Sequence, residues 1–194
     1  DAYGYALPGN PELASELAAR DASFTHNRTG IYGTMFIAAA ISCAQVMKDK
    51  EEIIRTALKY VPQESRFFIR SKICLDEILR ASDWEDGYKK INNILNEYGH
   101  CRIYQEVGMM INSFLFANNI YEGICIQVSQ GADTDSFGAS VGSLLGSYYG
   151  QEGLDSKWLE IFNDDIHTGM AWFFERSVSK LAKRMGRLPV NFSK

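Results

Sequence analysis

The residues with the clearest potential for chemistry occupy four consecutive positions, Asp133 to Ser136, and comprise two carboxylates and two hydroxyls. Oxygen ligands of this kind bind hard cations such as Mg²⁺, Mn²⁺ or Ca²⁺ rather than soft metals. Gly131 precedes the cluster, and a glycine lets the backbone turn tightly or adopt a positive φ. The cluster therefore predicts a turn that carries ligands for a divalent cation.

The same four residues would also make a good helix N-cap, because Asp and Ser accept hydrogen bonds from the first free backbone N–H groups. Carboxylates are also favourable at the positive end of a helix dipole. A run of apolar and small residues follows, in which Gly138, Gly142 and Gly146 lie along one helical stripe. We therefore expect a buried element, a sharp turn, and then a closely packed helix that begins at the acidic cluster.

The composition bounds the class of protein. The chain has 194 residues, of which 46% are hydrophobic and 23% charged, as in an ordinary globular domain. The net charge of −4 does not favour a nucleic-acid partner. No apolar run approaches the length of a membrane span, and the N-terminus has no signal-peptide pattern, so we expect no membrane partner.

The four cysteines, at positions 43, 74, 101 and 125, form no Cys-x-x-Cys pair. Each lies in or beside an apolar helical pattern. This arrangement predicts structural thiols in a reducing compartment, and hence a cytoplasmic protein, rather than disulfides or a zinc site.

Helical periodicity dominates the chain and predicts an all-α, multi-helix bundle. The segment 31–47 is apolar on nearly every side, which is typical of a central, buried helix. The segment 120–128 has the composition of a strand, but its apolar residues also fit helical spacing, and we predict a helix. Other helices are predicted from Asn10-Pro11 to about Phe24, from a capping box at Asp49 to Val61, at 65–79, from Trp84 to a C-cap at Gly99, at 106–116, around 158–162 and at 168–184.

The string from Gly131 to Gly150, Gly-Ala-Asp-Thr-Asp-Ser-Phe-Gly-Ala-Ser-Val-Gly-Ser-Leu-Leu-Gly-Ser-Tyr-Tyr-Gly, closely resembles a known signature. It is similar to the C-terminal metal-binding signature of the ADP-ribosylglycohydrolase family, which includes the dinitrogenase-reductase-activating glycohydrolases. The segments 5–14, 22–26 and 30–33 resemble earlier parts of the same family in the same order. The resemblance thus covers nearly the whole chain.

The resemblance implies an all-helical domain that uses two divalent cations, usually Mg²⁺ and alternatively Mn²⁺. It implies hydrolysis of the bond between ADP-ribose and a modified protein or small molecule. Asp133, Asp135 and Ser136 correspond to metal ligands, and we assign Asp133 and Asp135 to catalysis. In such a reaction the metals can orient ribose hydroxyls and a water, while a nearby carboxylate serves as base.

The resemblance also implies a substrate-binding role for His26, Gly30, Tyr32 and Gly33. We expect the loop from Thr25 to Gly33 to receive the phosphates or the distal ribose of ADP-ribose. The residues alone leave a second interpretation open, in which this segment is a simple interhelical turn and His26 contacts a backbone carbonyl.

One part of the family pattern is missing. The family has a hydroxyl-Asp-Asp run near its N-terminus that supplies the other half of the metal site, whereas Asn163-Asp164-Asp165 lies after the signature. Because the chain also opens on Asp1 rather than Met, we expect residues 1–194 to be a single all-α domain that forms the C-terminal part of a larger one. A missing N-terminal segment would then be its partner. The alternative is a catalytically silent family member that binds a nucleotide or has a structural role.

Overall fold

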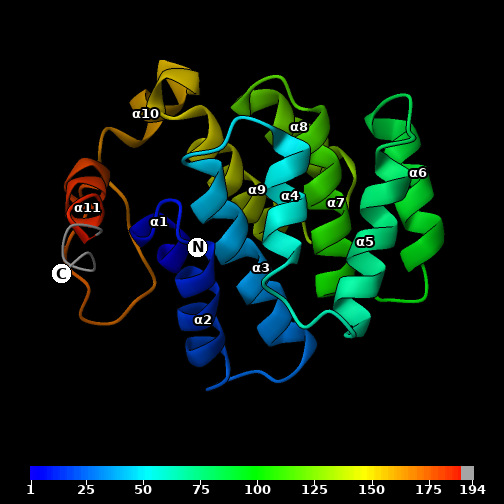
Figure 1. Cartoon of the computed structure of the whole chain (residues 1–194). Helices are drawn as coiled ribbons and strands as arrows, with labels where there is room; N and C mark the ends of the chain where they lie inside the picture. The colour runs from blue at the N-terminus through cyan, green and yellow to red at the C-terminus, as the bar shows by residue number, and fades with distance from the viewer. Residues whose placement is uncertain (189–194) are drawn as a thin grey trace.

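The computed structural model describes residues 1–188 and confirms the all-α class (Figure 1). Within that range the regular elements are helices, and no strand longer than an isolated bridge occurs. The helices are α1 (Ala2–Ala6), α2 (Pro11–Ala22), α3 (Thr29–Ala44), α4 (Lys50–Leu58), α5 (Arg66–Ile78), α6 (Trp84–Leu95), α7 (Ile103–Phe116), α8 (Ile120–Ser129), α9 (Thr134–Tyr149), the short 3-10 helix η1 (Gln151–Gly153), α10 (Ser156–Phe162) and α11 (Val178–Met185).

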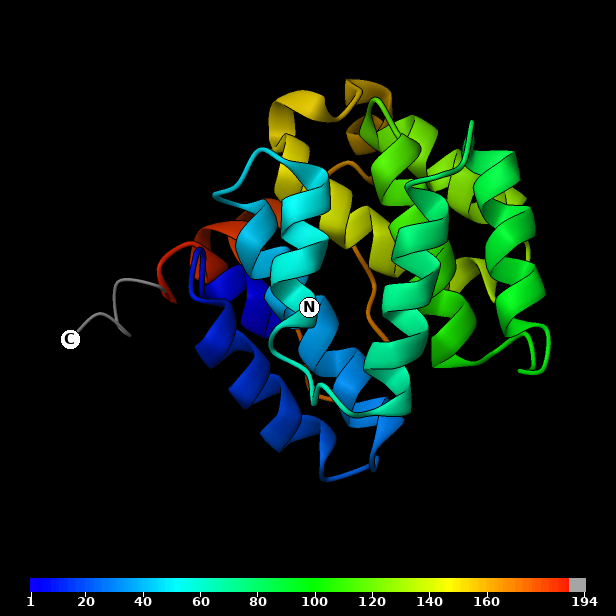
Figure 2. The same cartoon turned by 45° about the vertical axis from the view of Figure 1, so that its right-hand side comes forward.

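Helix α3 is the central element, as its apolar sequence predicts. It packs against α1 and α2 on one side and against α4, α5, α7 and α9 on the others. Figures 1 and 2 show α3 running through the bundle, with α5 and α6 forming one edge. Among the described residues, no helix is long and apolar enough to cross a membrane.

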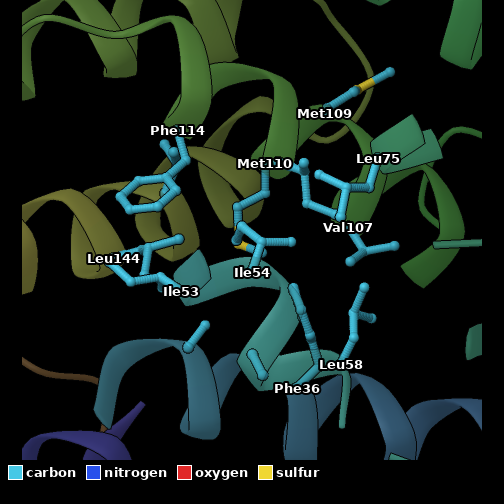
Figure 3. Close-up of a cluster of buried hydrophobic side chains, with 14 of the residues drawn as sticks. Phe36, Ile53, Ile54, Leu58, Leu75, Val107, Met109, Met110, Phe114 and Leu144 are labelled. Carbon is cyan, nitrogen blue, oxygen red and sulfur yellow. The ribbon is translucent and has the colours of Figure 1, made fainter. Parts of the chain in front are cut away.

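The main core lies where α3, α4, α5, α7 and α9 meet. Figure 3 shows side chains from these helices converging, among them Phe36, Ile54, Met110 and Phe114, each at most 2% exposed. Burying an aliphatic or aromatic side chain of this size contributes roughly 1.5–3 kcal/mol. The packing of these faces, rather than local helix propensity, therefore holds the bundle together.

Helix starts are set by short polar caps that can be recognised in the sequence. Asn10 accepts a hydrogen bond from the backbone N–H of Leu13, and Asp49 from that of Glu52. Both caps are at the predicted positions, which confirms them. The segment 120–128 is also helical, as predicted.

The predicted end of α6 is wrong. The helix ends at Leu95 and not at a glycine C-cap at Gly99. The reason is a tertiary contact: the side-chain amide of Gln105 donates to the carbonyl oxygens of Leu95 and Tyr98, at 2.8 and 2.7 Å. A side chain from α7 thereby satisfies carbonyl groups that the glycine was expected to help terminate.

The predicted terminal helix at 168–184 is also wrong over its first half, since α11 begins at Val178. The preceding residues form an antiparallel bridge between Asp165 and Ser177. Arg176 donates two hydrogen bonds to the Asp165 carboxylate, and Ser177 caps α11. These polar contacts favour a hairpin-like loop over a continuous helix.

The cysteine prediction holds for two of the four residues. Cys43 and Cys74 are buried, and burial raises their thiol pKa values to about 11 and about 12. Cys101 and Cys125 are exposed, so the expectation that they are structural thiols within apolar packing is wrong.

The prediction that the glycine stripe of α9 is closely packed is wrong. A Cβ added to Gly138 would be 3.9 Å from its nearest neighbour, Val128 Cγ2, which is an ordinary contact. The tight approach between α8 and α9 is instead at Gly123, where a Cβ would be 2.2 Å from Leu145 Cδ1 and 3.0 Å from Ala117 Cβ.

This difference predicts opposite effects for two matched substitutions. Gly123→Ala is expected to destabilise the fold by about 1–3 kcal/mol, because Leu145 is completely buried and has to move. Gly138→Ala is expected to be neutral or to stabilise the fold by up to about 1 kcal/mol, the helix propensity gained over glycine. Urea unfolding measures both. Equal effects would contradict this description of the α8–α9 contact.

Candidate functional site

The acidic cluster begins α9, immediately after a sharp turn. Gly131 and Ala132 have positive φ values of 79° and 63°, and Asp133 occupies the N-cap position. The side chain of Asp133 nevertheless makes no capping hydrogen bond. Its Oδ2 atom instead accepts a hydrogen bond from Cys101 Sγ at 3.4 Å. The capping function therefore does not account for this carboxylate.

Asp133 and Asp135 lie two residues apart at the start of α9. A hydrogen bond with the Asp133 carboxyl lowers the pKa of Asp135, and the backbone N–H groups of Asp135 and Ser136 lower it further. Ser136 is exposed beside them at the start of the helix. The three predicted metal-ligating residues thus lie on a single turn, with their oxygen atoms accessible from solvent.

A cleft of about 660 Å³ lies next to this turn. It is formed by the α2–α3 loop, the first residues of α3 and the segment before and within the start of α7. The lining residues are Thr25, His26, Asn27, Thr29, Gly30, Thr34, Tyr98, Cys101, Arg102, Ile103, Tyr104 and Glu106. Cys101 therefore both lines this cleft, called the larger cleft below, and contacts Asp133.

Of the four predicted substrate-binding residues, His26 and Gly30 line the larger cleft. The Nδ1 atom of His26 is 2.8 Å from Thr25 Oγ1. A Cβ on Gly30 would be 2.9 Å from the His26 ring, so glycine allows the ring to rest against the start of α3. The backbone N–H of Gly30 donates to the carbonyl oxygen of Asn27 at 3.2 Å, so it is already paired within the loop.

The other two predicted residues lie apart from the larger cleft. Gly33 lines a smaller cavity of about 240 Å³, where a Cβ would be 2.5 Å from Ile103 Cδ1. Tyr32 lines neither cavity and packs, half-buried, against the core. The motif that these residues share thus places one of them at a helix–helix contact and one at the edge of the core.

Sequence reasoning missed Glu106, which lines both cavities. Its carboxylate accepts a hydrogen bond from Ser140 Oγ of α9 at 2.7 Å. Burial raises the pKa of Glu106, the bond from Ser140 opposes this shift, and the charge of Asp133 adds to it. The signal was available, since Glu106 is the only charged residue in the apolar helix α7.

The donor atoms fit one side of the shell of a hard cation. Asp133 and Asp135 supply carboxylate oxygens and Ser136 a hydroxyl, a set that suits Mg²⁺ or Mn²⁺. Within residues 1–188, no cluster of three or more His, Cys, Asp or Glu side chains is arranged to hold a metal ion. The two carboxylates of the Asn163-Asp164-Asp165 run have other partners. Asp164 accepts hydrogen bonds from Ser177 and Ser179, and Asp165 pairs with Arg176.

The fold and the site define an all-α domain in which a cleft adjoins an acidic helix N-terminus. The family model described as ADP-ribosylglycohydrolase matches residues 2–187. The chain therefore belongs to the ADP-ribosylglycohydrolase family, as its signature predicted, and membership indicates an ADP-ribosyl hydrolase activity. No match to a curated protein or to a solved structure was found.

The environment of Glu106 predicts how stability responds to pH. A pKa that is raised in the folded state lowers stability as the pH rises through it. Glu106→Gln keeps the size and the acceptor for Ser140, so this variant should melt at a higher temperature than the wild type at pH 7. The difference should shrink toward pH 4, where Glu106 is protonated in the wild type.

Circular dichroism melts between pH 4 and pH 8 test this expectation. Glu85→Gln is the control, because Glu85 is exposed in the first turn of α6. A Glu106→Gln variant that is less stable than the wild type at pH 7 would show that the ionised carboxylate contributes to the fold.

Proposed function

We propose that this chain is a metal-dependent hydrolase that releases ADP-ribose from a modified protein or small molecule. In this proposal the larger cleft receives ADP-ribose, and Asp133, Asp135 and Ser136 hold Mg²⁺, with Mn²⁺ as a substitute. One observation carries it: Cys101 lines the cleft and contacts Asp133 at 3.4 Å, so the acidic turn lies at the edge of the cleft.

The lining of the cleft supports an anionic ligand that carries a base and a ribose. Thr29, the first residue of α3, lines the cleft, and a helix N-terminus favours phosphate groups. Arg102 adds a cation to the same wall. Tyr98 and Tyr104 stack with ring centroids 4.2 Å apart and offer an aromatic surface for a base.

The chain's own residues have distinct tasks in this mechanism. When bound, the metal supplies Lewis-acid polarisation of ribose hydroxyls and of a water. Asp135, with its lowered pKa, keeps the negative charge that balances the metal. Asp133 makes no capping hydrogen bond, and beside its role as a ligand its carboxylate would orient and deprotonate the water. Glu106 lies where the two cavities meet and, with its raised pKa, can carry a proton for the leaving group.

The metal assignment predicts that Asp135→Asn weakens Mn²⁺ binding at least about tenfold, because a ligand loses its charge. Titration calorimetry, with the melting temperature measured in parallel, tests this. Glu85→Gln is the matched control, since it also removes a carboxylate from the first turn of a helix. If Asp135→Asn changes stability alone, as a weakened helix terminus would, the metal assignment fails.

The cleft assignment predicts that His26→Ala weakens ADP-ribose binding about tenfold, while Mn²⁺ affinity and melting temperature stay near the wild-type values. His26 is exposed, and its ring forms a hydrogen bond with the neighbouring Thr25, so little stability is lost. His167→Ala, in the loop before α11, is the control.

Lower stability with unchanged ADP-ribose affinity would make His26 a residue of the interhelical turn. Binding of ADP-ribose without release of ADP-ribose from a modified substrate would favour the catalytically silent alternative.

A further inference from the structure

A buried polar network reaches the residue just before the acidic turn. Gln130 follows the last residue of α8 and is only 3% exposed. Its Nε2 atom donates to Ser113 Oγ at 2.7 Å and to the carbonyl oxygen of Met109 at 3.3 Å. Its Oε1 atom accepts from Asn112 Nδ2 at 2.9 Å. Both ends of the Gln130 amide are therefore held by α7.

The network is anchored beyond α7 as well. Asn112 Nδ2 also donates to the carbonyl oxygen of Trp84, the first residue of α6, at 2.8 Å. Ser113 Oγ donates to Gln127 Oε1, one turn earlier in α8, at 2.9 Å. Asn112, Ser113 and Gln127 are completely buried. The position of Gln130 is thus fixed relative to three helices.

The two residues that follow Gln130 have an unusual backbone conformation. Gly131 and Ala132 both have positive φ values, and this conformation is costly for an alanine because of its Cβ. Such conformations persist when the surrounding structure over-determines them. The chain leaves α8 at Gln130, whose side chain is locked, and enters α9 at Asp133. The fixed Gln130 therefore constrains where this turn begins.

We propose that Gln130 is a positioning residue for the cation site. This inference rests on the proposed function only in taking Asp133 and Asp135 as ligands. The buried amide holds the strained turn in one conformation. The conformation of this turn sets the direction of the Asp133 side chain, which no capping hydrogen bond restrains. Without Gln130, the turn can relax to other conformations, and the two carboxylates lose their common orientation.

Gln130→Met and Gln127→Met separate positioning from stability. Both substitutions remove a buried amide from the same network, but Gln127 lies within α8 and is not joined to the turn. NMR relaxation dispersion of the metal-free chain reports conformational exchange of residues 131–136 directly. Titration with Mn²⁺ reports the affinity, and thermal melts report the stability of each variant.

Gln130→Met is expected to cause conformational exchange across residues 131–136 that the wild type lacks, and to lower Mn²⁺ affinity about tenfold. Gln127→Met is expected to lower the melting temperature, with the turn still in one conformation and the Mn²⁺ affinity near that of the wild type. If Gln130→Met fails to fold, Gln130→Glu takes its place, because it keeps the size and an acceptor for Asn112 but loses the Nε2 donor.

The outcomes distinguish this inference from the proposed function. Equal conformational exchange and equal Mn²⁺ affinity in the two variants would overturn the positioning role and leave the metal site intact. A wild-type chain that binds no Mn²⁺ would refute the metal site. Conformational exchange at the turn in Gln130→Met alone would then still establish that Gln130 fixes the turn.

Discussion

The structure depends on one constraint, which is that the second half of helix α3 cannot face water on any side. Phe36 and every residue from Ala38 to Ala44 are at most 2% exposed. A helix of this kind has to be enclosed, whereas each surrounding helix needs only one apolar face. The hydrophobic free energy gained by covering α3 therefore determines where α1, α2, α4, α5, α7 and α9 lie.

Three helix N-termini come together at the open end of α3. Thr29, at the start of α3, is within 3.3 Å of the Tyr104 hydroxyl at the start of α7. Cys101, just before α7, contacts Asp133 at the start of α9. The positive ends of these helices favour an anion in the cleft between them. The carboxylates of Asp133 and Asp135 offset that potential locally, which makes a cation acceptable beside an anionic ligand.

Helix α9 is held at both ends by interactions of different kinds. At its C-terminal end, the Lys50 ammonium lies 5.3–5.4 Å from the ring centroids of Phe114, Tyr148 and Tyr149, and burial lowers the pKa of Lys50. The Tyr-Tyr ending of the signature therefore takes part in packing. At its N-terminal end, the hydrogen bonds of Gln130 hold the residue that leads into the turn before α9. A rigid α9 keeps the acidic turn in place relative to the cleft.

The sequence by itself determined most of the helices, the N-caps at Asn10 and Asp49, the buried nature of α3 and the acidic turn, because periodicity, capping and signature residues act over a few neighbouring positions. Only the tertiary structure decided that Glu106 faces the cleft and that Tyr32 does not. It also decided that Gln105 ends α6 and that Gln130 anchors the turn. These outcomes rest on contacts between residues far apart in the chain, and local pattern carries no information about which distant partner a buried polar side chain will meet.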